Sequence, residues 1–145
     1  MNMISFRALL FILSLAVGPA FAADRLVSII APSEARPGSS VHVSVSAGTD
    51  ALDGEGVGFL HAEYSIDGGN TWNGICFEEK GGSMLERAAD FSVGAAGSKA
   101  VVRVRAAFRG GKAGDVDFKG EPIKWEETWS NWRTPPAKFA IIYVR

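Results

Sequence analysis

Apolar and polar residues alternate along several stretches of the chain, and this period of two predicts β-strands rather than helices. The most regular stretch is residues 99–108. One face of that strand would carry Val102, Val104, Ala106 and Phe108, and the other Val101, Arg103, Arg105 and Ala107. Since one face is wholly apolar and the other is mixed, we expect the apolar face to lie against a core.

Further strands are predicted where apolar runs lie between turn residues such as Pro-Gly and Gly-Gly. They are residues 26–31, 41–47, 59–66, 72–77, 89–93, 123–130 and 138–144. A short helix over residues 84–89 is an alternative for the stretch before 89–93, because it contains good helix formers. Seven or eight short strands without a long helix predict an all-β sandwich of two antiparallel sheets.

A tight turn over residues 67–70 joins the strands predicted at 59–66 and 72–77. Its sequence is Asp-Gly-Gly-Asn, in which glycine adopts positive φ at no steric cost and Asp and Asn bond their own backbone. The residues around it match the pattern Ser-X-Asp-X-Gly-X-Thr-Trp with Ser65, Asp67, Gly69, Thr71 and Trp72. This pattern resembles the Asp-box of sialidase-like propellers.

In those propellers the Asp-box is a structural hairpin that is repeated in several blades and lies away from the catalytic centre. This chain has one copy, whereas a propeller needs roughly four to eight blades of about forty residues each. Similar hairpins occur in immunoglobulin-like modules, including the dimerisation domain of molybdenum oxidoreductases. The resemblance therefore implies a structural hairpin rather than a catalytic or sugar-binding loop.

Other patches resemble immunoglobulin-like and fibronectin type III domains. The Pro-Gly turn before residues 41–47 resembles the link between their A and B strands. Val-Arg-Val-Arg-Ala at 102–106, followed by Trp-Ser-Asn-Trp at 129–132, resembles the F strand and the Trp-Ser-X-Trp-Ser region of cytokine-receptor-type modules. This resemblance implies a cation–π ladder of Arg103 and Arg105 on the tryptophans at 129 and 132. An immunoglobulin-like or fibronectin type III-like sandwich is therefore the expected fold class.

The first 22 residues have the composition of a cleaved signal peptide. Arg7 supplies a positive charge, residues 8–17 are almost wholly apolar, and Ala-Phe-Ala at 20–22 is a small-X-small cleavage site. The apolar run is shorter than the roughly twenty residues that span a bilayer. We therefore expect an exported protein, periplasmic or secreted, with a single sandwich domain over residues 23–145 and no membrane span after cleavage.

The charge balance argues against nucleic acid as a partner. The formal net charge is −1, and no stretch is polybasic, so neither nucleic acid nor an anionic membrane surface is favoured. Cys76 is the single cysteine, so no disulfide forms within the chain. It is either a small buried hydrophobe or one half of an intermolecular disulfide.

The sequence contains no set of residues that predicts catalysis. His42 and His61 are the two histidines, and both lie on outward strand faces that a sandwich places in different sheets. We expect them to be solvated and not to serve as a catalytic base. Glu126 and Glu127 point to opposite faces of a strand, so they do not form the carboxylate pair of a glycosidase. The protein is therefore expected not to be an enzyme and to need no cofactor other than, in one hypothesis, calcium.

That hypothesis places a cation between two acidic loops. In an immunoglobulin-like topology the loop after the second strand and the loop after residue 108 lie at the same end of the sandwich. Calcium takes about six to eight oxygen ligands from such loops. The candidate ligands are Asp50, Asp53, Glu55, Asp115, Asp117 and Glu121. The alternative is that these charges only keep the loops soluble.

Three of the four tryptophans lie close together in the sequence. They either pack in the core and on the arginines or form an exposed aromatic platform, which holds protein partners and sugars alike. We expect a non-catalytic interaction module that binds a protein partner, in adhesion or assembly, through an aromatic face or a sheet edge. The alternative is a carbohydrate-binding module that uses the same tryptophans and, under the calcium hypothesis, a cation at the acidic loops. The candidate ligand-binding residues are Trp125, Trp129, Trp132, Arg103 and Arg105.

Overall fold

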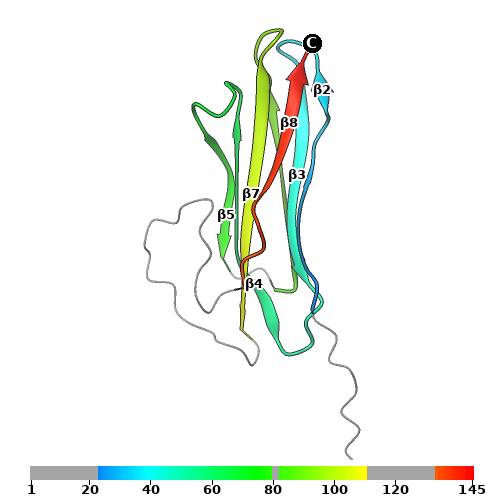
Figure 1. Cartoon of the computed structure of the whole chain (residues 1–145), viewed down its shortest axis with the longest axis vertical. Coiled ribbons are helices and arrows are strands. Elements are labelled where there is room, and N and C mark those ends of the chain that lie inside the picture. Colours follow the sequence, from blue (N-terminus) through cyan, green and yellow to red (C-terminus); the bar gives the residue numbers. More distant parts are fainter. Residues whose placement is uncertain (1–22, 80–81, 111–132) are drawn as a thin grey trace, which may run out of the picture.

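The computed structural model describes residues 23–79, 82–110 and 133–145 (Figure 1). The strands in these ranges are β1 (Arg25–Ile30), β2 (Glu34–Ala35), β3 (Ser40–Thr49), β4 (Glu55–Ser65), β5 (Asn73–Glu79), β6 (Met84–Ser92), β7 (Lys99–Gly110) and β8 (Lys138–Val144). No helix in the described part of the chain is long and apolar enough to cross a membrane. The predicted signal peptide and the strand predicted at 123–130 lie outside the described residues.

The strands form two sheets that pack face to face, so the predicted all-β sandwich is confirmed. One sheet has the order β1-β3-β6 and the other the order β2-β8-β7-β4-β5. All pairings are antiparallel except the short one between β2 and β8. The first sheet matches the A, B and E strands of an immunoglobulin-like sandwich, and β8, β7, β4 and β5 match G, F, C and C′. In Figure 1 the long strands of both sheets run along the long axis of the molecule.

The core lies between the inner faces of the two sheets. β7 is placed as its alternation predicts, and its buried inner residues are Val102, Val104, Ala106 and Phe108. The other sheet contributes every second residue of β3, namely Val41, Val43, Val45 and Ala47. Each large apolar side chain that is fully buried stabilises the fold by roughly 1.5–3 kcal/mol relative to an exposed one.

Three elements differ from the sequence prediction. Residues 84–92 form one strand, which is longer than the predicted strand at 89–93, and the alternative of a helix over 84–89 is wrong. Continuous pairing with β3 outweighs the helix propensity of this stretch. β4 begins at Glu55, which makes the loop after β3 shorter than expected. The continuous apolar run of residues 26–31 is typical of a strand that lies against the core, yet β1 buries Val27 and leaves Leu26 and Ile30 67% and 71% exposed, because alternate residues of this strand face away from the core.

Candidate binding face

The candidate site lies on the outer face of the five-stranded sheet, which is turned away from the core. β7 places Arg103 and Arg105 there because they alternate with its buried valines. The register sets Arg103 opposite Glu63 of β4 and Phe139 of β8, and it sets Arg105 opposite His61 of β4. Three adjacent strands, β8, β7 and β4, therefore contribute side chains to one surface.

Arg103 is held from two directions. Its Nε donates to Glu63 Oε2 at 2.9 Å, and its Nη2 contacts the same oxygen. Its guanidinium carbon lies 3.6 Å from the centroid of the Trp72 ring. A guanidinium that is both stacked and hydrogen-bonded is fixed in position, so it can meet a partner with little further loss of side-chain entropy.

The hairpin between β4 and β5 is closed by its own side chains and carries Trp72 at its end. Asp67 accepts hydrogen bonds from Ser65 Oγ at 2.6 Å, from the Thr71 N–H at 2.9 Å and from Thr71 Oγ1 at 2.7 Å. Ser65 Oγ in turn accepts the Gly69 N–H at 2.8 Å. These bonds, chiefly the one from Ser65, lower the pKa of Asp67 well below its ordinary value. The motif residues thus stabilise the turn, while the family resemblance of the motif stays a prediction.

Arg105 and His61 form a second polar contact on this face. Arg105 Nη2 lies 2.9 Å from His61 Nδ1. Because a guanidinium only donates, we assign Nδ1 as the acceptor and place the ring proton on Nε2, which lies 3.3 Å from Glu63 Oε1. The Phe77 ring packs edge-on against the imidazole, with 5.2 Å between the centroids. Burial and then the charge of Arg105 lower the pKa of His61, so the imidazole is neutral at pH 7.

β8 adds a row of large apolar side chains to the same face. Phe139, Ile141 and Tyr143 are 54%, 45% and 39% exposed. The residues that alternate with them face the core: Ala140, Ile142 and Val144. Lys99 Nζ and the Arg145 guanidinium carbon lie 5.5 and 5.6 Å from the centroid of the Tyr143 ring. Sequence reasoning missed this row, although large apolar residues on both faces of one strand were a signal for it.

The structure brings the predicted ligand residues Arg103 and Arg105 to one face. Among the described residues, the aromatic neighbour of Arg103 is Trp72, and that of Arg105 is Phe59. The Arg105 guanidinium carbon lies 5.9 Å from the centroid of the Phe59 ring. Neither contact was foreseen, because both join residues that are far apart in the sequence. The predicted tryptophans lie outside the described residues: Trp125, Trp129 and Trp132. Their stacking on the arginines and their exposure stay predictions.

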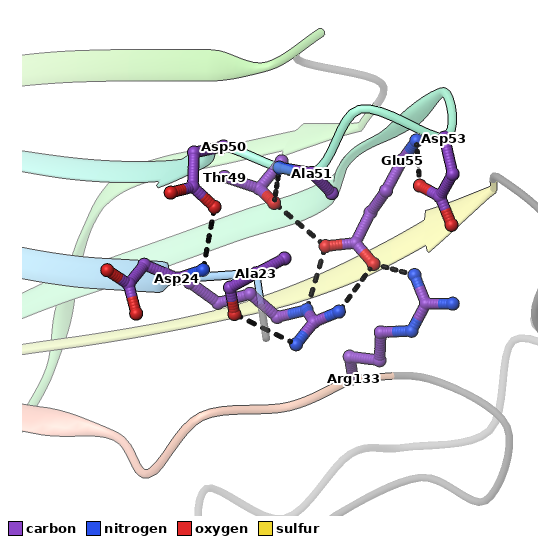
Figure 2. Close-up of polar contacts among 9 residues, drawn as sticks. Ala23, Asp24, Thr49, Asp50, Ala51, Asp53, Glu55 and Arg133 are labelled. Atoms are coloured by element: carbon purple, nitrogen blue, oxygen red, sulfur yellow. Dashed lines mark hydrogen bonds and ion pairs between the residues drawn. The ribbon is translucent and has the colours of Figure 1, made fainter. Parts of the chain in front are cut away.

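The acidic loop after β3 is organised around Glu55 (Figure 2). The side chain of Glu55 is fully buried. Arg25 donates to both carboxylate oxygens at 2.7 and 2.9 Å, and Thr49 Oγ1 donates to Oε1 at 2.9 Å. The Arg133 guanidinium contacts Oε2. Glu55 is therefore the centre of a buried ion-pair cluster.

The other two described acids of this loop bond main-chain N–H groups. Asp53 accepts from Glu55 at 3.2 Å, and Asp50 accepts from Asp24 at 2.7 Å. Glu55 pairs with Gly110, so this loop lies beside the end of β7. The remaining predicted calcium ligands lie outside the described residues: Asp115, Asp117 and Glu121. Within the described ranges no three His, Cys, Asp or Glu side chains are placed to hold a metal ion, and the calcium site stays a prediction.

The two histidines lie in different sheets, as predicted. His42 is exposed, and its Nδ1 lies 2.9 Å from Asp90 Oδ1. The prediction of a solvated side chain is wrong for His61, because 19% of its side chain is exposed. Arg105 and Phe77 contact the ring from the two neighbouring strands, and a strand face that points away from the core is therefore not always open to water.

Cys76 lies on the core side of β5, opposite Ala62 of β4. Its thiol is partly buried, 3.9 Å from the Leu60 carbonyl oxygen, and burial raises its pKa. Disulfide exchange requires an accessible thiolate. This placement favours the prediction of a small hydrophobe over that of an intermolecular disulfide.

No protein-family model matches the chain, and a search of curated proteins finds no significant match. The class of the protein, an all-β sandwich of two sheets, therefore rests on its strand order. The candidate face rests on its own geometry.

Proposed function

We propose that this protein is an exported, non-catalytic module that binds a protein partner through the outer face of its five-stranded sheet. The observation that carries the proposal is the row of Phe139, Ile141 and Tyr143 on β8, three large apolar side chains that all meet solvent. Adjoining apolar side chains of this size on a surface are typical of interaction sites. Export itself rests on the composition of residues 1–22.

The surroundings of this row support a protein partner. Lys99 and Arg145 flank Tyr143, and the stacked Arg103 adjoins Phe139 across the β7–β8 pairing. Aromatic residues and arginine dominate the binding energy of protein interfaces. Because the strands hold these side chains on a rigid sheet, little ordering is needed when a partner binds.

The contacts of His61 support a non-catalytic role. A histidine that serves as a general base directs a free ring nitrogen toward a nucleophile. In this protein Nδ1 of His61 accepts from Arg105, and Nε2 faces Glu63. The carbohydrate-binding alternative depends on three tryptophans outside the described residues, so it stays a prediction.

The proposal is tested by affinity capture followed by reconstitution. The protein is immobilised, exposed to the envelope and secreted fractions of its source, and any retained protein is purified for measurement of its Kd. Ile141→Lys places a charge in the middle of the row and should weaken binding by at least about tenfold, as expected for an apolar anchor. The matched control is Ile30→Lys, because Ile30 is 71% exposed on the outer face of the other sheet.

Retention of one protein by the wild type and by Ile30→Lys, but not by Ile141→Lys, supports the proposal. Equal binding by all three proteins would place the interface elsewhere. Retention of polysaccharide alone would favour the carbohydrate-binding alternative.

A further inference from the structure

β6 forms an edge of the three-stranded sheet, and among the described strands it pairs only with β3. The pairing runs from Ser40 opposite Ser92 to Gly48 opposite Met84 without a register shift. By contrast, β5, at an edge of the other sheet, has a register shift in its pairing with β4. An edge strand presents a row of N–H and C=O groups to which another strand can be added, and a bulge disrupts such a row. β6 is therefore a long and regular edge.

The hydrogen bonds at both ends of β6 show which groups face this edge. Val93 N–H donates to Ser39 O, and Thr49 N–H donates to Ser83 O, both at 2.9 Å. Bonding alternates along an antiparallel ladder, so the odd-numbered residues of β6 bond to β3. The even-numbered residues direct their N–H and C=O groups to the free edge: Met84, Glu86, Ala88, Asp90 and Ser92. The Arg87 Nη1 donates to Glu86 O at 2.7 Å, which agrees with an outward carbonyl, and the Arg87 Nε donates to Glu78 Oε1 of β5 at 3.0 Å. An added strand would therefore displace the Arg87 guanidinium from Glu86 O.

The same even-numbered residues carry exposed side chains on the outer face of the sheet. Glu86 and Asp90 place two negative charges four residues apart, with the small Ala88 between them. Their neighbours across β3 are Ser46 and His42. An added strand would complement this row with basic side chains at two positions four residues apart and a small or β-branched residue between them.

We propose that the free edge of β6 binds an extended, basic segment of a partner protein as an added antiparallel strand. Main-chain bonds would supply affinity, and the charges of Glu86 and Asp90 would select the basic segment. A second copy of β6 that pairs about Ala88 would set Glu86 of one copy against Asp90 of the other, and like charges at that distance repel. Charge complementarity thus favours a basic partner segment over self-association.

This inference rests on the proposed function in one respect, because both describe a protein-binding module. It concerns a different surface, the edge of the three-stranded sheet, and so it has its own variants. If the peptide experiment below fails while Ile141→Lys still releases a captured partner, the edge site is wrong and the proposed function stands.

The test measures binding of a labelled synthetic peptide to the protein purified after expression of the full chain. The probe is the nine-residue peptide Thr-Val-Lys-Val-Thr-Val-Lys-Val-Thr with blocked ends, followed by fluorescence anisotropy. Ala88→Pro removes an N–H that faces the edge and does not bond to β3, so it should weaken binding at least about tenfold with the fold retained. Ala88→Thr keeps the N–H and should bind the peptide as the wild type does.

Two modified peptides keep the test valid if Ala88→Pro does not fold. N-methylation of the central threonine blocks an amide that would bond to β6, whereas N-methylation of the neighbouring valine blocks one that faces solvent. We expect only the first to abolish binding. Replacing both lysines with glutamates should weaken binding by roughly tenfold, since two favourable charge pairs become repulsive.

The proposal would be overturned if the lysine peptide does not bind, if it binds no better than the glutamate peptide, or if both N-methylated peptides lose binding equally. A dimer in sedimentation that Ala88→Pro abolishes, without peptide binding, would assign the edge to a second copy of the chain instead.

Discussion

Arg25 holds the buried carboxylate of Glu55 through two parallel hydrogen bonds, Nε to Oε1 at 2.7 Å and Nη2 to Oε2 at 2.9 Å. Arg25 begins β1 of one sheet, and Glu55 begins β4 of the other. The pair therefore ties the two sheets together at one end of the sandwich. Arg133, which precedes β8 in the sequence, contacts the same carboxylate.

Removing the charge of Glu55 should destabilise the fold. Glu55→Gln keeps the shape of the side chain but leaves two guanidinium groups without their counter-charge. We expect the free energy of unfolding to fall by about 2 to 3 kcal/mol, somewhat less than for fully buried partners, because both arginines are partly exposed. Urea denaturation measures the change.

The matched control for this prediction is Glu34→Gln. Glu34 also pairs with an arginine, Arg145, at 2.9 Å, but 55% of its side chain is exposed. Its replacement should change the free energy of unfolding by less than about 1 kcal/mol. Equal losses in the two variants would show that burial of the Glu55 cluster is not what stabilises this end of the sandwich.

The hydrogen bonds to Asp67 should make stability fall in acid. Its pKa in the folded protein lies below its ordinary value of 3.8, so its contribution is complete above that pH and is lost as the pH falls. Asp67→Asn lacks this titration. We therefore expect wild-type stability to fall more steeply than that of the variant from about pH 4 downward. Urea denaturation at several acidic pH values tests this, and parallel curves would contradict it.

His61 should produce a second pH dependence at a higher pH. Its pKa is lowered in the folded protein, so the unfolded chain takes up this proton first as the pH falls through the ordinary value of 6.5. Wild-type stability should consequently decrease between about pH 7.5 and 5.5. In His61→Gln this decrease should be smaller. If the two proteins lose the same stability over this range, protonation of His61 is not opposed by the fold.

Gly56 lies beside the turn before β6, and Gly48 lies beside Met84 of β6. Adding a methyl group should reduce stability by different amounts at these two glycines. A Cβ at Gly56 would lie 2.8 Å from the Gly82 carbonyl oxygen, whereas a Cβ at Gly48 would lie 2.9 Å from the end of the Met84 side chain. A backbone carbonyl is harder to displace than the flexible thioether at the end of a methionine side chain. Gly56→Ala should therefore cost about 2 kcal/mol of stability and Gly48→Ala less than about 1 kcal/mol. Thermal unfolding compares them, and a larger cost at Gly48 would contradict this account.

The sequence predicted the strands best where the apolar pattern is strong. Residues 99–108 lie within β7, where burial of every second residue from Val102 to Phe108 in the core imposes a period of two on the sequence. Residues 138–144 coincide with β8, which is a continuous apolar run bounded by turn residues. Residues 84–92 were harder to predict. Their exposed and partly buried side chains follow no strong period, and pairing with β3 rather than their own propensity makes them a strand.

The candidate face was predicted only in part. The alternation of β7 put Arg103 and Arg105 on one side, which the structure bears out. It gave no information on Trp72 as the partner of Arg103, since that contact depends on how the hairpin is placed relative to β7. The apolar row on β8 could have been predicted, because the sequence of residues 138–144 is apolar on both faces of the strand.

The sequence by itself determined the turn at residues 67–70, the alternation of β7 and the two-sided apolar character of β8, because each depends on residues that are neighbours in the chain. Only the tertiary structure decided that Glu55 is buried between Arg25 and Arg133, and that His61 lies beneath its neighbours rather than in water. Contacts of this kind depend on which strands pair and in what register. Those choices are made by the packing of the whole sandwich, and no local pattern contains them.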